Sequence, residues 1–136
     1  MNGKTTAVVK MKPPIFQGVI ARFPRALEAI AEVSRVGTAK HNVPLDDTAV
    51  MLSQSHGEHS DAMMRHIVAH AEHGPFNEEN GETILHDAQV AWRALARLEK
   101  WLYDREAKEA RCGSAIAEVQ AAADFGGPSE PADLAI

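Results

Sequence analysis

The stretch ETILHDAQVAWRALARLEKWLYD, residues 82–104, decides the fold class of this chain. Its apolar residues recur at intervals of three and four, which is the spacing of one face of an α-helix. We therefore expect a long core helix from about Glu82 to Asp104 and an all-α fold around it. The residues of the expected core face are Leu85, Ala88, Ala91, Trp92, Leu95, Leu98 and Leu102.

Two further helices are expected before this stretch. The first begins at Pro24, because proline is tolerated in the first turn of a helix, and it ends at Gly37, a common helix-ending residue. The second runs from about Glu58 to the Gly74-Pro75 pair. Together with the core helix, they predict a bundle of three main helices.

The remaining segments are expected to be less regular. Residues 37–57 form a long connection whose middle can hold a helical turn, and loops of this length in small domains are commonly functional. FNEENGE, residues 76–82, is expected as a polar turn, and a weaker fourth helix over 106–123 is interrupted at Gly113. The predicted organisation is an N-terminal arm over 1–21, a helical domain over 22–105, and a weak helix with a Gly- and Pro-rich tail over 106–136.

Composition excludes several classes of function. The net charge of −5 gives no basic footprint for nucleic acid. The single cysteine, Cys112, excludes an internal disulfide and fits a reducing compartment. No stretch approaches the roughly 18 apolar residues of a membrane span, and no signal peptide is evident. We therefore expect a soluble cytoplasmic protein without a membrane or nucleic-acid partner.

Four acids lie at helical spacing on the first two helices. Glu28 and Glu32 are four residues apart, and Glu58 and Asp61 are three apart, so each pair shares a helix face. If the two helices pack side by side, the four carboxylates converge and repel each other unless cations neutralise them. Oxygen ligands of this kind suit Mg²⁺ or Mn²⁺. The alternative is that all four are solvated residues on amphipathic helices.

All seven histidines lie between His41 and His86. The spacing of His66 and His70 could form a zinc face, but no cysteine lies nearby to complete the ligands that zinc prefers. Arg65 follows Asp61 by one turn and can either pair with it or bind a phosphate through its planar fork.

Two other features of the sequence leave alternatives open. Lys40-His41-Asn42 follows the first helix and can either clamp phosphates or a base edge, or form an ordinary turn. Trp92 can pack in the core or stack on a base.

The acids resemble a known pattern. Glu28-Ala-Ile-Ala-Glu32 followed by Glu58-His-Ser-Asp61 is similar to the EExxE…ExxD motif of MazG-type all-α nucleoside triphosphate pyrophosphohydrolases, with Ala29 in place of the second acid. The segments FPRALEAIAEVSRVG, AKHN, HSDAMMRH and HDAQVAWRALARLE resemble, in order, the phage and bacterial dATP/dGTP diphosphohydrolase group that includes the MazZ enzymes. This second resemblance covers about residues 22–98.

The resemblance implies an oligomeric, MazG-like helical bundle that hydrolyses a purine deoxynucleoside triphosphate to the monophosphate and pyrophosphate. It favours dGTP, with dATP as a second substrate, and a phage pathway to 2-aminoadenine in the host cytoplasm. It also implies two or more Mg²⁺ or Mn²⁺ ions and a homodimer or homotetramer. The implied metal-binding and catalytic residues are Glu28, Glu32, Glu58 and Asp61. The implied substrate-binding residues are Lys40, His41, Asn42, Arg65, His66, His86 and Arg93.

Two other readings stay open. Glu58-His59-Ser60 followed by Leu85-His86-Asp87 resembles the HD-domain phosphohydrolase pattern, in which His59, His86 and Asp87 would bind metal. That fold needs a further distal aspartate, and only Asp104, Asp124 and Asp133 remain. The other reading is a non-enzymatic helical interaction protein whose acids and histidines face solvent.

Overall fold

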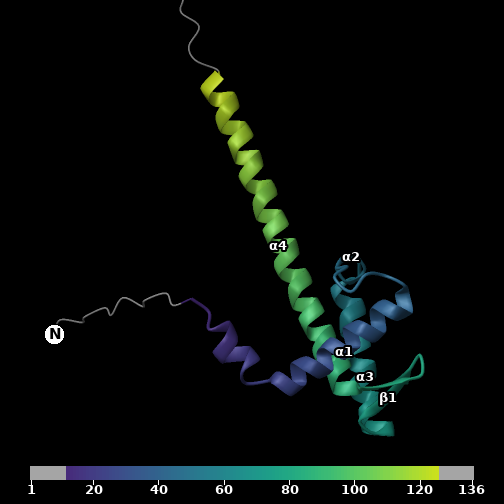
Figure 1. Ribbon diagram of the computed structural model, residues 1–136. Helices are drawn as coiled ribbons and strands as arrows, with labels where there is room; N and C mark the ends of the chain where they lie inside the picture. Colours follow the sequence, from purple (N-terminus) through teal and green to yellow (C-terminus); the bar gives the residue numbers. More distant parts are fainter. Residues whose placement is uncertain (1–11, 126–136) are drawn as a thin grey trace, which may run out of the picture.

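The structure is a computed structural model that describes residues 12–125. It is mostly helical, so the predicted all-α class is confirmed, with the addition of one small antiparallel hairpin (Figure 1). Predictions for residues 1–11 of the arm and 126–136 of the tail lie outside the described residues. The elements in order are η1 (Phe16–Ile20, a π-helical turn), α1 (Pro24–His41), α2 (Ala49–Ser53), α3 (His56–His73), β1 (Phe76–Glu79), β2 (Glu82–Leu85) and α4 (His86–Phe125).

The two helices that the sequence predicts over 82–104 and 106–123 are one helix, α4, which begins at His86 and not at Glu82, because residues 82–85 form strand β2. Helix α4 runs without a break through Gly113, where nothing lies within 4 Å of the position of a side-chain Cβ. A glycine inside a helix costs about 1 kcal/mol, and the alanine, glutamate, lysine and arginine residues around it favour the helix enough to carry it through. The second half of α4 therefore projects well beyond the other helices (Figure 1).

The segment predicted as a polar turn, FNEENGE, is instead most of a β-hairpin. β1 pairs with β2 in a register that sets Phe76 opposite Leu85 and Glu79 opposite Glu82. The two residues between the strands are Asn80, with φ of 53°, and Gly81, with φ of 77°. Asn-Gly with two positive φ angles is typical of the tight turn that matches the twist of a two-stranded hairpin.

The first helix begins at Pro24, as the sequence predicts, but it does not end at Gly37. It continues for one more turn, and His41 is its last residue. Asn42 caps it with a φ of 52°, in the left-handed region. The Asn42 N–H donates to the Ala39 carbonyl and closes the last turn. Asparagine tolerates this conformation, and open space around Gly37 leaves the helix free to pass through it. Lys40 therefore lies in a helix and not in a loop.

The second main helix, α3, begins with a capping box. Ser55 Oγ accepts from the Glu58 backbone N–H at 3.1 Å, and Glu58 Oε2 accepts from the Ser55 N–H at 2.6 Å. This reciprocal pair starts the helix at His56, two residues before the predicted start. The helix ends before Gly74, and the helical turn expected in the middle of residues 37–57 is present as α2.

Helix α4 is the centre of the packing. α3 lies along it, and α1, α2 and β2 also contact it, so α1 and α3 both make their main contacts with α4. The buried apolar residues are few and small apart from Ile84 and Val36; they are Val36, Ala62, Ile84, Ala88 and Ala96. Leu95 and Leu98, expected in the core, are 50% and 54% exposed.

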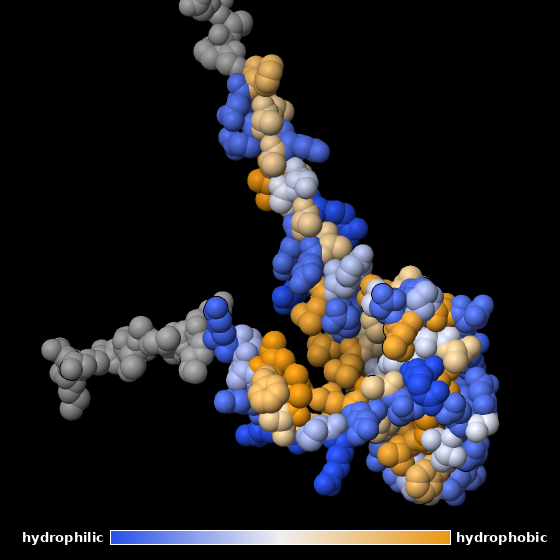
Figure 2. Space-filling view, viewed as in Figure 1, coloured by the Kyte–Doolittle hydropathy of each residue, from blue (hydrophilic) through white to orange (hydrophobic). Residues whose placement is uncertain are grey.

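Other large apolar residues are also at the surface. Phe16 and Phe23 are 68% and 54% exposed. Figure 2 shows hydrophobic residues on η1 and on the part of α4 that lies across a hollow from it.

Candidate active site

A cavity of about 710 Å³ lies between the C-terminal half of α1, the connection through α2, one face of α3, the hairpin and the first turns of α4. Its polar wall contains both signs of charge. The basic residues are Lys40, His41, Arg65, His66 and Arg93, and the acidic residues are Asp47, Glu78 and Glu79. Val33, Met51 and Trp92 contribute apolar surface beside them.

Five of the seven predicted substrate-binding residues line this cavity; they are Lys40, His41, Arg65, His66 and Arg93. His86 is 5% exposed and lies next to the wall, with its Nδ1 atom 3.2 Å from Nδ1 of His66. Asn42 is not on the wall, because its backbone caps α1. The structure therefore collects residues that are up to 53 positions apart in sequence around one space.

Arg93 is the most firmly held of the cavity cations. Its Nη1 atom donates to Gln54 Oε1 at 2.7 Å and contacts His59 Nδ1 at 3.3 Å. Its guanidinium lies 5.3 Å from the centre of the Trp92 ring, within range of a cation–π contact. Burial lowers the pKa of Arg93, and the nearby Arg65 lowers it further. Arginine nevertheless remains charged in proteins.

Trp92 lies in the same wall and is fixed from the other side. Its Nε1 donates to Ser34 Oγ at 2.8 Å, which ties α4 to α1. The indole therefore contributes both to packing between helices and to the cavity surface, so the core reading of Trp92 and the binding reading are compatible.

Glu79 is a cavity residue that the sequence analysis missed. Its Oε1 accepts from Lys40 Nζ at 2.6 Å, and its Oε2 accepts from Gln89 Nε2 at 3.1 Å. Gln89 Oε1 in turn accepts from Asn77 Nδ2 at 3.0 Å. Residues two apart on a strand share a face, so reading Asn80-Gly81 as a hairpin turn would have placed Asn77 and Glu79 on one side.

The four predicted metal-binding acids do not line the cavity. Glu32 accepts from Arg35 Nε at 2.8 Å, and Arg35 also binds Glu82 on the hairpin, which raises the pKa of Arg35. Glu58 is used in the capping box, where the Ser55 N–H and hydroxyl lower its pKa. The structure gives Glu28 no ion-pair or hydrogen-bond partner among residues 12–125.

These acids are not brought together: α1 and α3 each make their main contacts with α4, and Glu32 and Glu58 are held by other partners. Within residues 12–125, no group of three or more His, Cys, Asp or Glu side chains is placed to hold a metal ion. One chain therefore does not assemble the four-acid site that the spacing suggested. The roles of the individual acids stay predictions.

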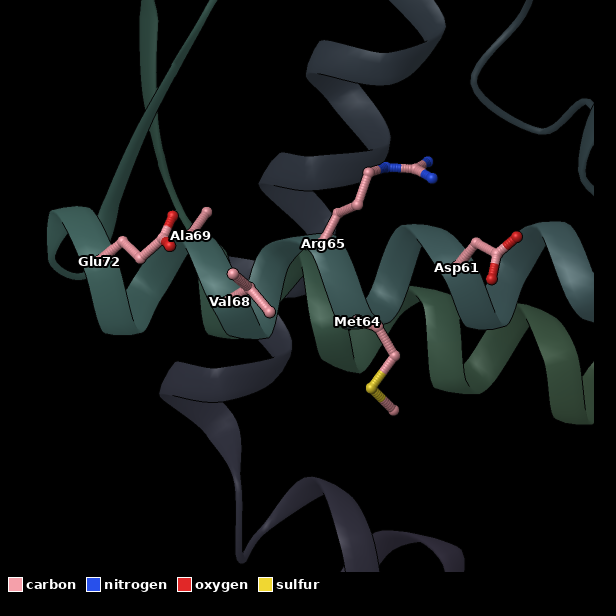
Figure 3. A pocket seen from close by; sticks show the side chains of 6 residues that line it. All are labelled: Asp61, Met64, Arg65, Val68, Ala69 and Glu72. Atoms are coloured by element: carbon pink, nitrogen blue, oxygen red, sulfur yellow. The ribbon is translucent and has the colours of Figure 1, made fainter.

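Asp61 lies in a shallow depression of about 440 Å³ on the outer face of α3, shown in Figure 3. Arg65 lines both this depression and the main cavity. In Figure 3 the two side chains extend in different directions. Among the ion pairs between described residues, none includes Arg65, so its guanidinium can bind an anion. The depression is lined by Asp61, Met64, Arg65, Val68, Ala69 and Glu72.

A family model described as "dATP/dGTP diphosphohydrolase, N-terminal" matches residues 4–110. The chain belongs to this family. The match spans every candidate residue from Glu28 to Arg93, and its description indicates a hydrolase that acts on deoxynucleoside triphosphates. No curated protein and no solved structure matches the chain.

Within this dATP/dGTP diphosphohydrolase domain, the three residues of the HD reading are separated. His59 is fully buried and contacts the Met51 carbonyl oxygen at 3.0 Å. His86 contacts His66, whereas Asp87 accepts from His70 Nδ1 at 2.8 Å on the surface. Each residue has a different partner, and the geometry gives the HD reading no support.

The His66–His86 contact is the other titratable feature of the domain's cavity. Burial lowers the pKa of His66, and His86 and Arg93 lower it further. Because Nδ1 of His66 faces His86, Nε2 is the ring atom left to contact a phosphate or a sugar hydroxyl. No helix in the described part of the chain is long and apolar enough to cross a membrane.

Proposed function

We propose that this member of the dATP/dGTP diphosphohydrolase family hydrolyses a purine deoxynucleoside triphosphate, preferably dGTP and also dATP, to the monophosphate and pyrophosphate. The observation that carries the proposal is the gathering of Lys40, Arg65 and Arg93 around one cavity in a chain of net charge −5. An acidic protein binds a polyanion through such local clusters of cations or through bound metal ions. The volume, about 710 Å³, lies within the range of small-molecule sites.

Each cation has a distinct role in this proposal. Arg93 presents the donors that its contacts with Gln54 and His59 leave unused, so a phosphate meets a fixed fork. Arg65, with no ion-pair partner among residues 12–125, adds a second guanidinium. Lys40 is paired with Glu79 before substrate binds. An entering phosphate would compete with Glu79 for the lysine.

The nucleoside is proposed to contact the less charged part of the wall. Trp92, Val33 and Met51 offer a flat ring and aliphatic surface there. Preference for dGTP, and service to a phage pathway that makes 2-aminoadenine, rest on the resemblance of the sequence to the phage group.

Mg²⁺ or Mn²⁺ is part of the proposal. Mg²⁺ commonly binds through one or two carboxylates together with substrate phosphates, so it does not require a preformed cluster of acids. Glu79 can supply such a carboxylate from the cavity wall, and Asp61 lies one turn before Arg65 on α3. Glu28, Glu32 and Glu58 remain the other predicted ligands. A bound ion would neutralise phosphate charge and lower the pKa of a water molecule.

The proposed reaction is the one that the family resemblance implies, and the cavity cations support it. A water oxygen forms a bond to the α-phosphorus, the bond from that phosphorus to the bridging oxygen breaks, and pyrophosphate leaves with the bonding electrons. A carboxylate, Glu28 or Glu58 by the sequence pattern or Glu79 by its position, accepts the proton of the water. Lys40, Arg65 and Arg93 stabilise the charge on the leaving pyrophosphate.

We also propose that the working form is a homodimer or homotetramer. The proposal is supported by large apolar residues left at the surface of η1 and α4, such as Phe16 and Leu98. Monomers rarely expose extended apolar surface of this kind. The second chain would cover it.

A direct test is to incubate the purified protein with each deoxynucleoside and ribonucleoside triphosphate, with Mg²⁺, with Mn²⁺ or with a chelator. The expected result is metal-dependent release of a purine monophosphate and pyrophosphate, fastest with dGTP. Stepwise release of orthophosphate would reject the proposed bond cleavage. Absence of turnover with every nucleotide would reject the function.

A further inference from the structure

His59 is the largest fully buried side chain among the described residues and has no exposed surface. It lies on the inner face of α3 but contacts two other elements. Its Nε2 atom is 3.0 Å from the Met51 carbonyl oxygen in α2, and its Nδ1 atom is 3.3 Å from Arg93 Nη1 in α4. Its ring also lies 6.5 Å from the Trp92 ring, centre to centre. His59 does not line the cavity.

The two partners define how this ring is protonated. A guanidinium can only donate, so Arg93 requires Nδ1 of His59 to be an acceptor. A carbonyl can only accept, so the Met51 oxygen requires a proton on Nε2. Both contacts are satisfied by one form alone, the neutral ring with its proton on Nε2.

The same contacts define the orientation of Arg93. Its Nη1 group carries two protons, and Gln54 and His59 provide one acceptor for each. The Nε and Nη2 protons remain, and these two groups make the parallel fork that fits two oxygens of a phosphate. Without an acceptor at His59, the guanidinium keeps Gln54 as its partner for Nη1 and can rotate about its bonds.

We propose that His59 is a positioning residue that orients Arg93 toward the bound phosphate by accepting a hydrogen bond from Nη1, while the Met51 carbonyl fixes the histidine tautomer. This inference rests on the proposed function, in which Arg93 binds substrate phosphate. It gives His59 a role different from metal binding, and it makes the short helix α2 part of the support of the site.

The test uses two variants that separate the two nitrogen atoms of the ring. In His59→Asn, the side-chain amide lies where Nδ1 lay and its oxygen can accept from Arg93. In His59→Gln, the amide reaches the position of Nε2 and can donate to the Met51 carbonyl, but the acceptor for Arg93 is lost. Each variant keeps one of the two hydrogen bonds, so both should lose similar amounts of thermal stability.

Calorimetry measures the affinity for dGTP in Ca²⁺, which binds phosphates and is used in place of the metal that supports turnover. The kcat/KM value is measured separately in Mn²⁺. If Arg93 loses its orientation, the phosphate loses one of its two charge-assisted hydrogen bonds to Arg93. This loss predicts roughly tenfold weaker binding for His59→Gln and less than about threefold for His59→Asn. In an Arg93→Ala background, the two His59 variants should bind equally well. Equal losses in the two single variants, or an undiminished difference without Arg93, would overturn the proposal.

A ligand-independent measurement separates failure of this inference from failure of the proposed function. The rotation of the Arg93 guanidinium is followed by ¹⁵N NMR in the protein alone. We expect slow rotation of the Arg93 guanidinium in the unaltered protein and in His59→Asn. We expect fast rotation in His59→Gln. Equal rotation rates in all three proteins would show that His59 does not hold Arg93, whatever the nucleotide assays give.

Discussion

Replacing Arg93 with lysine tests the phosphate-binding role of the cavity most sharply. Lysine keeps the positive charge but offers a single ammonium group in place of a planar fork. The contacts of Nη1 with Gln54 and His59 leave the Nε and Nη2 groups of Arg93 for the ligand. The substitution therefore removes one of two phosphate hydrogen bonds, and the flexible lysine chain has no equivalent anchors.

The size of the effect follows from the bond that is lost. A hydrogen bond to a charged group contributes about 1.5–3 kcal/mol, and each 1.4 kcal/mol is a factor of ten in binding. Affinity for dGTP should therefore fall by roughly 10- to 150-fold. The measurement is calorimetric titration of dGTP, paired with kcat/KM for pyrophosphate release.

Arg105→Lys is the matched control. Arg105 also lies on α4 and also covers a tryptophan ring, with its guanidinium 5.1 Å from the centre of Trp101, but it does not line the cavity. Its replacement should leave dGTP binding within about twofold of the unaltered protein. If Arg93→Lys is as mild as Arg105→Lys, the guanidinium of Arg93 does not bind phosphate and the assignment of the cavity fails.

Three further outcomes are expected. Burial depresses the pKa of His66, so the histidine resists protonation in the native protein. Thermal stability should therefore hold above the unfolded pKa of about 6.5 and decline as pH falls below it. Thermal melts from pH 8 to 5 should show a smaller decline in His66→Asn, and an equal decline would contradict the depressed pKa of His66. Gly81→Ala, at φ of 77°, should lower the free energy of unfolding by about 1 kcal/mol. Gly113→Ala, inside a helix with open space around it, should raise the free energy of unfolding by about 0.5–1 kcal/mol. Denaturant unfolding measures both, and changes of the same sign would refute the hairpin or the continuous helix. Leu98→Glu places a charge on the exposed apolar surface and should reduce the mass measured by light scattering to that of one chain. Ile116 lies farther along α4 and is also exposed, so Ile116→Glu tests whether the interface extends to the end of the helix.

Helical periodicity and capping residues predicted much of the fold. Pro24 does begin α1, and the Gly74-Pro75 pair does follow α3. Glycine was the less reliable signal, because Gly37 and Gly113 both lie inside helices that continue past them. The hairpin was missed because its polar residues suggested a simple turn, although Asn80-Gly81 carried the specific signal for paired strands.

The candidate site was predictable in its cations and less so in its acids. Lys40, Arg65 and Arg93, which the resemblance implies as substrate-binding residues, line one cavity, and their binding role stays a prediction. The spacing of Glu28 and Glu32 defines a shared helix face but not the direction of that face. That direction depends on how α1 packs on α4, which is long-range information. Glu79 was not identified because its place on the wall depends on the register of the hairpin.

The central claim is that water attacks the α-phosphorus of a purine deoxynucleoside triphosphate bound in this cavity. The most direct test is turnover of dGTP with Mn²⁺ in water enriched in ¹⁸O, with mass spectrometry of both products. We expect one ¹⁸O atom in the dGMP and none in the pyrophosphate. Label in the pyrophosphate, or release of dGDP with labelled orthophosphate, would contradict it.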